Sequence, residues 1–388
     1  MKILFLFTDM IRQNRLSGSI DKSSAVHDLD KIIQSLGGSF YTNCYTVAPD
    51  TPRSLAAFFS GAEPSVNGCD RFTKWPQFFM NVEEKNVFEI FNEAGYHMDF
   101  LTDPLERQCG MLPQFVLDKF SHNELYSVSD FFKSLKLKEK HLVFASFPQF
   151  HWTLHAIGAS TFGESQAYRD ISYALKTMLS LIDIEEFDHV FLFSDHGFKF
   201  THEIRMTEPY RILDEDRTNV LFLHKQKGQK QITVNDTLCS LIDFKSLCVD
   251  ILNENLNGKE NYTLPEREHI IIEDHSTFNV NITTPIDLWA VKTRSSYYIR
   301  NLESGFHKSS NMSKYKSETS SKFDAILLKN LEFKSLMNIK RLQKYYKILK
   351  KDYPEASEIY DYRKSKINPF ISGFHKINDI IKHLFGKI

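Results

Sequence analysis

The chain has 388 residues, of which 42% are hydrophobic and 25% charged, and its formal net charge is −1. Nucleic-acid-binding proteins normally carry a basic excess, so this balance excludes a uniformly basic nucleic-acid binder, and the length allows one large or two ordinary domains. Five cysteines without a C-x-x-C pair argue against a disulfide framework or a cysteine-rich zinc site and favour reduced thiols in a cytoplasmic setting.

Apolar runs alternate with amphipathic stretches over the first 250 residues. The expected buried strands span residues 2–7, 97–101, 141–147, 189–194 and 219–224. Runs that are apolar throughout are typical of a parallel sheet covered on both faces. The expected helices between them span residues 54–61, 86–95, 167–182 and 236–252. This order predicts an α/β fold with a mainly parallel central sheet and helices on both faces.

The remainder of the chain differs in composition from the predicted sheet domain. A strand pair is expected at 268–274 and 295–301, and a Ser/Lys-rich linker at 306–324. Residues 325–388 are predicted to form a basic helical region. Residues 1–305 carry a net charge of −11 and residues 306–388 one of +10, so the near-neutral total conceals an acidic main domain and a basic tail.

The last 22 residues, 367–388, have apolar side chains on one helical stripe and Lys, His and Asn on the other. A basic amphipathic helix of this kind fits an anionic membrane surface, although most such stripes pack against their own protein. No apolar run approaches the roughly 20 residues that span a bilayer, and no signal peptide is evident. We therefore expect a cytoplasmic protein, with peripheral attachment to the inner face of the membrane as an option.

Chemically reactive residues follow the predicted strands. Asp9 follows the first strand, His151 and His155 follow the strand 141–147, and Asp195 with His196 follows the strand 189–194. In parallel α/β sheets the active site lies at the carboxyl ends of the strands. These residues are therefore expected to meet at one edge of the sheet.

Thr51 lies just ahead of a predicted helix that begins near Ser54. The positive end of a helix dipole and its free N–H groups form an anion site, and a metal on the hydroxyl would make Thr51 a nucleophile. Arg12 and Arg53 are candidate phosphate clamps, with a structural salt bridge as the commoner explanation for an isolated arginine. His202, six residues beyond His196, either lines the same pocket or is an exposed loop histidine.

Several segments together resemble the alkaline phosphatase/sulfatase superfamily. These segments are residues 7–18, 27–68, 86–101, 193–197 and 240–252, which include FTDMIRQNRLSG and FSDHG. The ordered series covers roughly residues 1–255 and is more specific than any single motif. The resemblance implies an alkaline-phosphatase-like fold for a catalytic domain over residues 1–305.

The resemblance also implies roles for individual residues. Asp9, Asp195 and His196 match metal ligands, and Thr51 matches the nucleophile, which is also a metal ligand, by its ten-residue offset from Gly61. Sulfatases carry a Cys or Ser at that position within C/S-x-P-x-R, modified to formylglycine, and this chain has Thr-Pro-Arg-Ser instead. It is closer to the phosphoethanolamine and phosphoglycerol transferases, which use an unmodified threonine.

His151 and His155 stand where the two-metal branch of the superfamily carries Asp-x-x-x-His. A second metal at this pair is one option. In the one-metal transferases the corresponding histidines contact the substrate phosphate or protonate the leaving group, and this role is preferred for both. The ligand set suits one divalent ion, Zn²⁺ first, with Mn²⁺, Mg²⁺ or Ca²⁺ as alternatives.

These observations predict a metal-dependent phosphotransferase with a threonine nucleophile. It would move a phosphoryl-linked group, such as phosphoethanolamine or phosphoglycerol, from a phosphorylated small-molecule or lipid donor to a glycan or lipid-linked acceptor, as in lipopolysaccharide or capsule modification. The alternatives are a phosphodiesterase or phosphatase of the same superfamily and, less favoured, a sulfatase or an inactive glycan- or lipid-binding member. No nucleic-acid partner is expected.

Overall fold

The computed structural model describes the main domain and little of the tail. The described residues are 1–13, 26–67, 69, 85–103, 112, 114–120, 125–158, 160–198, 213–254, 262–274, 288–301, 307–309 and 326. The chain divides into two compact units, Met1–Ser295 and Ser296–Ile388, and each is described by itself.

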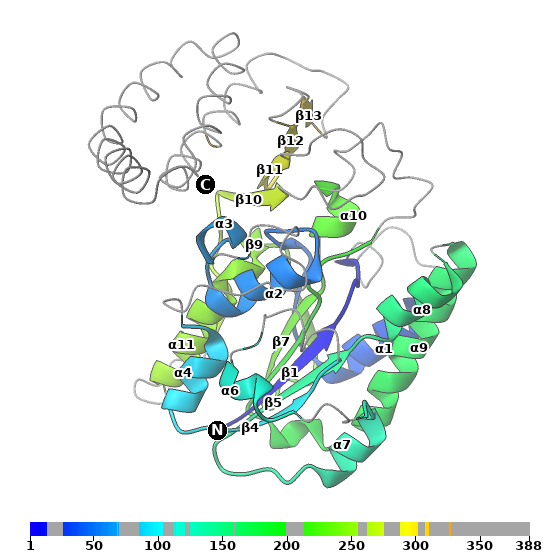
Figure 1. Cartoon of the computed structure of the whole chain (residues 1–388), viewed down its shortest axis with the longest axis vertical. Coiled ribbons are helices and arrows are strands. Elements are labelled where there is room, and N and C mark those ends of the chain that lie inside the picture. The colour runs from blue at the N-terminus through cyan, green and yellow to red at the C-terminus, as the bar shows by residue number, and fades with distance from the viewer. Residues whose placement is uncertain are drawn as a thin grey trace, which may run out of the picture. The chain divides into compact units, whose positions relative to one another are not determined.

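Seven strands form the central sheet of the first unit, in the order β4-β5-β1-β6-β7-β2-β8. Their bounds are β1 Lys2–Thr8, β2 Gly38–Tyr41, β4 His97–Leu101, β5 His141–Phe147, β6 His189–Phe193, β7 Phe222–Gln226 and β8 Ile232–Asn235. The first four strands in the spatial order are parallel, β7 runs antiparallel to β6 and to β2, and β8 is parallel to β2. The predicted mainly parallel sheet is therefore confirmed (Figure 1).

The expected strand at 219–224 needs correction. Asn219 and Val220 form isolated bridges with Tyr45 and Arg12, and the strand itself begins at Phe222. It is antiparallel to β6 rather than parallel. The short strands β2 and β8 were not predicted, because β2 contains two small residues and β8 has no buried side chain, so neither has a long apolar run.

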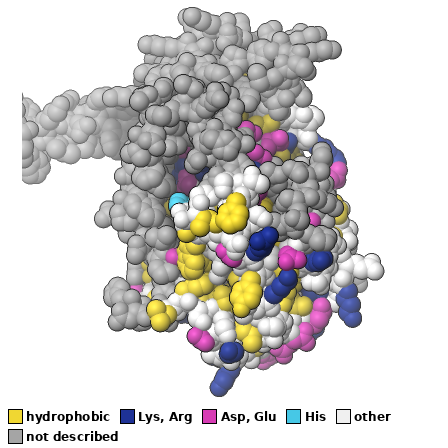
Figure 2. Space-filling model, turned by 90° about the vertical axis from the view of Figure 1, so that its right-hand side faces the viewer, with side chains coloured by type: hydrophobic (Ala, Val, Ile, Leu, Met, Phe, Trp, Pro, Cys, Tyr) yellow, Lys and Arg dark blue, Asp and Glu magenta, His cyan; other side chains and the backbone are white. Residues whose placement is uncertain are grey.

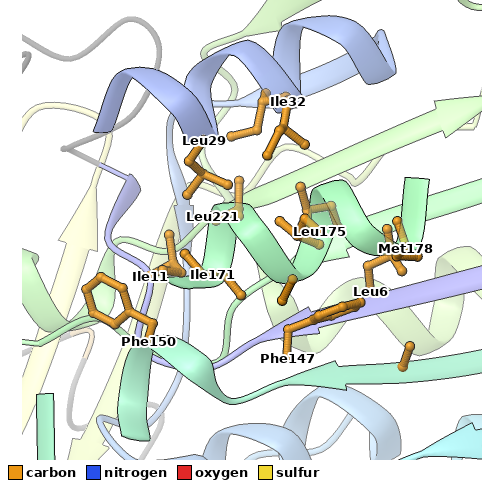
Figure 3. Close-up of a cluster of buried hydrophobic side chains, with 14 of the residues drawn as sticks. Leu6, Ile11, Leu29, Ile32, Phe147, Phe150, Ile171, Leu175, Met178 and Leu221 are labelled. Carbon is orange, nitrogen blue, oxygen red and sulfur yellow. The ribbon is translucent and has the colours of Figure 1, made fainter. Parts of the chain in front are cut away.

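Helices cover both faces of the sheet (Figure 1). The helices, in chain order, are α1 Val26–Leu36, α2 Thr51–Ser60, α3 Pro64–Asn67, α4 Val87–Glu93, α6 Gln114–Leu117, α7 Val128–Ser134, α8 Gln149–Ile157, α9 Thr161–Leu179, α10 Glu215–Thr218 and α11 Phe244–Glu254, with 3₁₀ turns at Ile184–Glu186 and Leu241–Asp243. Because strand side chains alternate, Leu4 and Leu6 join the core under α1, α7, α8 and α9 (Figure 3), whereas Phe5 and Phe7 join the core under α2, α4, α6 and α11.

Capping side chains set several helix starts. Asp50 caps α2, Asn86 and Glu89 form a capping box at α4, and Ser160 caps α9. The helix expected at 236–252 starts later than predicted. Residues Cys239–Ser240 form β9, paired with β3 (Cys44–Tyr45), before a 3₁₀ turn leads into α11.

Beyond α11 the chain forms short antiparallel pairs. In the first unit β10 (His269–Asp274) pairs with β11 (Leu288–Thr293), not with the stretch 295–301 as expected. In the second unit β12 (Tyr297–Asn301) pairs with β13 (His307–Ser309), and β13 is the only described part of the expected linker 306–324. Of the predicted helical region 325–388 only residue 326 is described, so that prediction, including the helix 367–388, stays open.

The described surface mixes charge types. In the view of Figure 2 acidic and basic side chains are interspersed with hydrophobic ones rather than collected into one block. Within the described part of the chain, no helix is both long enough and apolar enough to cross a membrane.

Two buried histidines lie side by side near the amino end of β6. His189 Nδ1 lies 3.1 Å from His224 Nε2, and His224 Nδ1 lies 3.2 Å from the Tyr262 carbonyl oxygen. A carbonyl can only accept, so His224 donates to Tyr262 and accepts from His189, and both rings are neutral. Burial lowers the pKa of His189 to about 4 and that of His224 to about 3.

This pair predicts acid sensitivity of the fold. Both folded-state pKa values lie below the ordinary 6.5, so below pH 6.5 the unfolded chain binds protons that the native chain does not. Stability is therefore present above pH 6.5 and is lost as the pH falls towards 4, by up to about 1.4 kcal/mol per pH unit for each histidine. Urea unfolding between pH 7 and 4 measures this slope.

The double variant His189→Gln/His224→Gln should flatten the slope, because its side chains do not titrate. His97→Gln, which removes a histidine with a 40% exposed side chain and a smaller lowering of its pKa, should flatten the slope much less than the double variant does. An unchanged slope in the double variant would contradict the assignment.

Candidate active site

The ends of β1 and β6 bring two acidic side chains together. The strands are parallel neighbours, with Phe7 in register with Phe193. Asp9 and Asp195 each follow two residues later, so they lie next to one another at the carboxyl edge of the sheet. The Met10 N–H donates to Asp195 Oδ1 over 3.2 Å, which joins the two strand ends directly.

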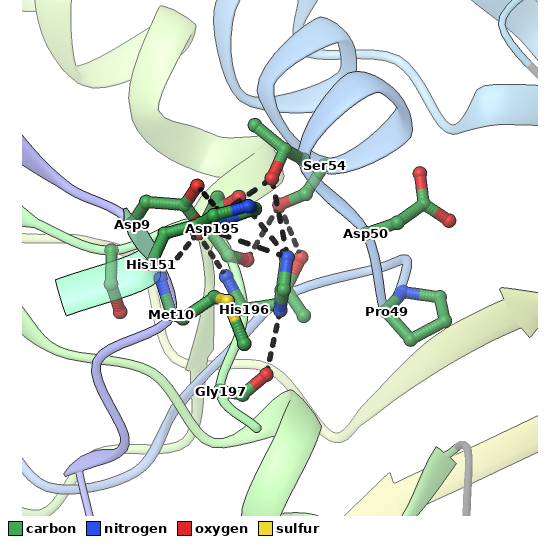
Figure 4. A network of polar contacts seen from close by, with 12 residues as sticks. Asp9, Met10, Pro49, Asp50, Ser54, His151, Asp195, His196 and Gly197 are labelled. Atoms are coloured by element: carbon green, nitrogen blue, oxygen red, sulfur yellow. Dashed lines mark hydrogen bonds and ion pairs between the residues drawn. The ribbon is translucent and has the colours of Figure 1, made fainter. Parts of the chain in front are cut away.

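Asp195 and His196 are oriented by their own backbone. Asp195 is fully buried, and its Oδ1 accepts the N–H of His196 at 2.7 Å. Its Oδ2 is buried with no hydrogen-bond partner among the described residues. His196 Nδ1 lies 2.6 Å from the Gly197 carbonyl oxygen, which can only accept. The proton is thus on Nδ1, and Nε2 presents a lone pair to Asp9 and Asp195 (Figure 4).

Position 197 requires glycine because neighbouring atoms leave no room for a side chain, not because of an unusual backbone angle. A Cβ there would lie 2.0 Å from the Asp216 carbonyl oxygen and 2.7 Å from Arg12 Cγ. The Gly197 N–H also donates to the Arg217 carbonyl oxygen at 2.8 Å. The chain after Asp195 is therefore pressed against α10, which fixes the direction of the adjacent His196.

Met10 has a strained backbone at the centre of the site. Its φ of 67° is in the left-handed region, which costs a non-glycine residue roughly 1–2 kcal/mol. This conformation directs the Met10 N–H at Asp195, as described above. Sequence reasoning missed Met10, because nothing in the residue type signals a left-handed conformation.

Thr51 is the first residue of α2, and its hydroxyl faces the acidic pair. Its Oγ1 lies 3.5 Å from Asp9 Oδ1 and 3.2 Å from His196 Nε2. The preceding Asp50 caps the helix by accepting the Arg53 N–H at 3.2 Å. The positive end of the helix dipole therefore lies at the threonine oxygen and favours negative charge there.

Ser54 connects α2 to the acidic pair. Its Oγ donates to the backbone carbonyl of Asp195 at 2.6 Å and lies 2.6 Å from Thr46 Oγ1. Ser54 is buried, three residues after Thr51 on the same side of α2. It was not predicted as a site residue, although its spacing from Thr51 is the kind of signal that could have found it.

The charges of the acidic pair are adjusted by their surroundings. Burial, and then the charge of Asp9, raises the pKa of Asp195 to about 6. Burial alone would raise the pKa of Asp9 too, but the charge and contact of His151 outweigh it and hold that pKa below its ordinary value. Two carboxylates this close favour a bound proton or a bound cation.

α8 supplies both predicted histidines. His151 Nδ1 lies 2.7 Å from Asp9 Oδ2, and its ring stacks on that of His155 with centroids 4.3 Å apart. Burial opposes a charge on His151, yet the charge of Asp9 raises its pKa to about 9. His155 is exposed, and partial burial followed by the charge of His151 lowers its pKa. The indole of Trp152 fixes α8 by donating to Asp103 at 2.8 Å.

The two candidate phosphate clamps are held by carboxylates. Arg12 is buried, lies 2.5 Å from Glu164 Oε1, and its guanidinium is 4.3 Å from the centre of the Phe198 ring. Arg53 pairs with Asp50 and, at 2.8 Å, with Asp274.

In Figure 4 the Asp50 side chain points away from Asp9 and Asp195. The geometry therefore gives the two arginines structural partners and does not place Arg53 on the metal side of the site. The third predicted substrate contact, His202, lies outside the described residues.

The residues present fit a divalent metal. One ligand atom from each of Asp9, Asp195 and His196 lies within 4.8 Å of the others, and all three residues are buried. Asp195 Oδ2 and His196 Nε2 are the atoms that such an ion would use, and the Gly197 carbonyl fixes the orientation of the imidazole ring through Nδ1. His155 belongs to no ligand group among the described residues.

A second group at the opposite edge of the sheet, His97, Asp99 and His141, has similar spacing. The Lys138 backbone N–H donates to His141 Nδ1 at 3.0 Å, so the ring proton must be on Nε2, which lies 2.9 Å from Asp99. That Nε2 has no lone pair for a metal. Lys138 Nζ also lies 3.1 Å from His97 Nδ1, and a second positive charge there is unfavourable.

The sequence matches no protein-family model and no curated protein sequence. Solved structures do match the fold. A candidate sulfatase from Bacteroides thetaiotaomicron is 14% identical, with a TM-score of 0.66 over 86% of this chain and 92% of that one. A 2-O GAG sulfatase is 13% identical, with a TM-score of 0.64 and the same coverage.

A phosphonate monoester hydrolase from Silicibacter pomeroyi is 11% identical, with a TM-score of 0.51 over 77% of this chain and 87% of that one. By name, these neighbours are sulfatases and a phosphonate monoester hydrolase. The fold expected from the sequence is therefore confirmed. At these identities the likeness concerns the fold, and the reaction has to be argued from the site.

The two ligand groups make a discriminating prediction about metal binding. Equilibrium dialysis with Zn²⁺ should find one tight site. Asp195→Asn should weaken that site by more than about 100-fold, since even outer-shell changes cost 10–100-fold. The matched control Asp99→Asn should leave it unchanged.

Asp195→Asn also removes one of two adjacent buried charges, so the metal-free variant should melt no lower than the parent. Loss of binding in Asp99→Asn, with retention in Asp195→Asn, would reverse the assignment.

Proposed function

We propose that the chain is a metal-dependent enzyme that transfers a phosphoryl-linked group through Thr51. The donor would be a phosphorylated small molecule or lipid, and the acceptor a cell-surface glycan or a lipid-linked precursor. Hydrolytic neighbours of the same fold support an enzyme of ester cleavage. The observation that carries the proposal is the Thr51 hydroxyl, which faces both Asp9 and His196 from the start of α2.

The chain's own residues account for the proton and bond changes at the nucleophile. The Thr51 hydroxyl donates towards Asp9 Oδ1, so this carboxylate is placed to receive its proton as the oxygen attacks. A bond forms from Thr51 Oγ1 to phosphorus, and the bond from phosphorus to the leaving oxygen breaks. Water or an acceptor hydroxyl then releases the group from the threonine.

A divalent ion held by Asp9, Thr51, Asp195 and His196 supplies, when bound, stabilisation of negative charge on the reacting oxygens. Zn²⁺ is proposed, because imidazole with carboxylates is a ligand set that zinc accepts readily.

His151 and His155 are proposed to deal with the leaving oxygen. His151 is anchored to Asp9, and His155 stacks on it towards solvent, which is the side from which a substrate would enter. A proton on either ring would be delivered to the departing oxygen. Arg12 and Arg53, being paired with carboxylates, are not assigned to the substrate.

Sulfate-ester hydrolysis is the second candidate, because sulfatases are among the structural neighbours. The first residue of α2 weighs against it. Sulfatases use a formylglycine made from Cys or Ser, and position 51 is a threonine. Parallel assays with an aryl phosphodiester, an aryl phosphate monoester and an aryl sulfate separate transfer and hydrolysis of phosphate from sulfatase activity.

Thr51 can be tested directly. Thr51→Ala should lower kcat on the aryl phosphodiester by about 10³-fold or more, as for other covalent nucleophiles, and abolish labelling by a radioactive phosphoryl donor. Thr51→Ser keeps the hydroxyl and should retain measurable activity.

Zn²⁺ binding should survive in both variants, because three ligands remain. Persistent labelling of Thr51→Ala would show that the nucleophile is another residue. If the parent protein bound no metal and no donor labelled it, a non-catalytic binding protein would be favoured.

Residues 367–388 are proposed to hold the protein at an anionic membrane surface. The proposal rests on their basic amphipathic pattern, since each Lys or Arg near such a surface contributes about 1 kcal/mol. A chain ending at residue 366 should no longer sediment with phosphatidylserine vesicles at 0.1 M salt, whereas the full chain should. Equal sedimentation of both would exclude this anchor.

A further inference from the structure

We propose that the β10–β11 pair is a latch on the nucleophile segment 46–54, and that Arg53 with Asp274 is the positioning pair that sets where Thr51 lies. The inference rests on Thr51 being the nucleophile, as proposed above. The latch comes from a part of the chain more than 200 residues away in sequence, beyond the strands that carry the metal ligands.

β10 contacts the nucleophile segment at two consecutive residues. The Glu273 N–H donates to the Val47 carbonyl oxygen at 3.0 Å. The next residue, Asp274, accepts from Arg53 Nη2 at 2.8 Å, and both side chains are buried. Backbone and side chain thus hold both ends of the loop that leads into α2.

Arg53 also bonds Asp50, the N-cap residue of its own helix α2. Its Nε donates to Asp50 Oδ2 at 2.6 Å, while Asp50 Oδ1 accepts the Arg53 backbone N–H. One guanidinium therefore bridges the cap residue of α2 and a strand of another sheet. The opposing pulls of burial and of the two carboxylates leave the pKa of Arg53 raised, so the group is always charged.

β11 contacts the residue before the nucleophile segment indirectly, through Glu215. Lys292 Nζ lies 2.8 Å from Glu215 Oε1, and the same oxygen accepts from the Tyr45 hydroxyl at 2.9 Å. Tyr45 immediately precedes the nucleophile segment. Because Ile270 and Lys292 are in register across the antiparallel pair, β10 and β11 act as one unit.

The contact between Arg53 and Asp274 helps to set the position of Thr51, because a second contact, from Ser54, holds the same helix turn from another direction. Ser54 ties α2 to the Asp195 carbonyl, and the adjacent Arg53 ties it to Asp274, about 100° further round the helix. The first turn of α2 is thus held between the metal-ligand strand β6 and the latch strand β10. Releasing one anchor lets the turn move, and a displacement of about 1 Å at a reacting atom can cost 10²-fold in rate.

The test compares Asp274→Asn with a matched control in the full chain. Asp243→Asn also changes a buried aspartate bonded to an arginine, Arg267, at 2.6 Å, but that arginine is not on the nucleophile segment. Asp274→Asn should lower kcat on the aryl phosphodiester about 10–100-fold with KM and Zn²⁺ affinity within about twofold of the parent. Asp243→Asn should keep kcat.

Hydrogen exchange supplies a readout that does not need activity. Amides of residues 46–54 should exchange faster in Asp274→Asn than in the parent, and not in Asp243→Asn, even if no substrate is ever turned over. Failure of the proposed function would appear as no Thr51-dependent activity in the parent, with this exchange pattern intact.

Arg53→Lys guards against misreading a folding defect, because it keeps the charge but loses the fork that reaches both carboxylates. It should lower kcat as Asp274→Asn does. The double variant should lower kcat by less than the product of the two single fold-changes, since both substitutions break the same contact. Unchanged exchange and kcat in both single variants would overturn the latch. A fall in Zn²⁺ affinity matching the fall in kcat would also overturn it, by placing the effect at the metal ligands.

Discussion

Two carboxylates buried against one another at the ends of β1 and β6 are the constraint on which the rest of the site depends. Asp9 and Asp195 follow neighbouring parallel strands whose register is fixed by continuous backbone pairing, so the two carboxylates are held close together. Burial raises the pKa of Asp195 and the charge of Asp9 adds to that effect. Adjacent carboxylates favour positive charge nearby, and His151 supplies it by contacting Asp9 Oδ2 at 2.7 Å. The buried Asp195 Oδ2 has no hydrogen-bond partner among the described residues and could contact a bound cation.

Helix α2, which carries the proposed nucleophile Thr51, is held against that charge cluster by contacts from both sides. Ser54 bonds the carbonyl of Asp195, so the helix start and the metal-ligand strand cannot move independently. Met10 has a left-handed backbone conformation, and its N–H donates to the Oδ1 of the same aspartate. Strain of this kind persists only where the surrounding structure fixes it, and here the surrounding structure is the sheet edge itself. Thr51 is thereby presented to Asp9 and His196 without making any strong bond of its own.

Sequence reasoning could place the sheet and the residues at its strand ends, because buried parallel strands are long apolar runs with polar residues directly after them. It failed where pairing is set by tertiary contacts. β2 and β8 lack an apolar signature, and β10 pairs with β11 rather than with the expected stretch 295–301. Side-chain partners were equally hidden. A lone Arg53 two residues after Thr51 reads as a phosphate clamp, and only the folded chain shows Asp274 arriving from 221 residues away to bind it.

The fold does not by itself define the reaction. Structures that share this architecture at 11–14% identity include both sulfatases and phosphonate monoester hydrolases, so the sheet cannot distinguish sulfur from phosphorus chemistry. In the proposed reaction the Thr51 oxygen carries a single phosphoryl-linked group, which water or an acceptor hydroxyl must then remove. Under that proposal the acceptor takes part in the reaction, and the position of Thr51, in a helix turn held by Ser54 and Arg53, matters more than the overall likeness.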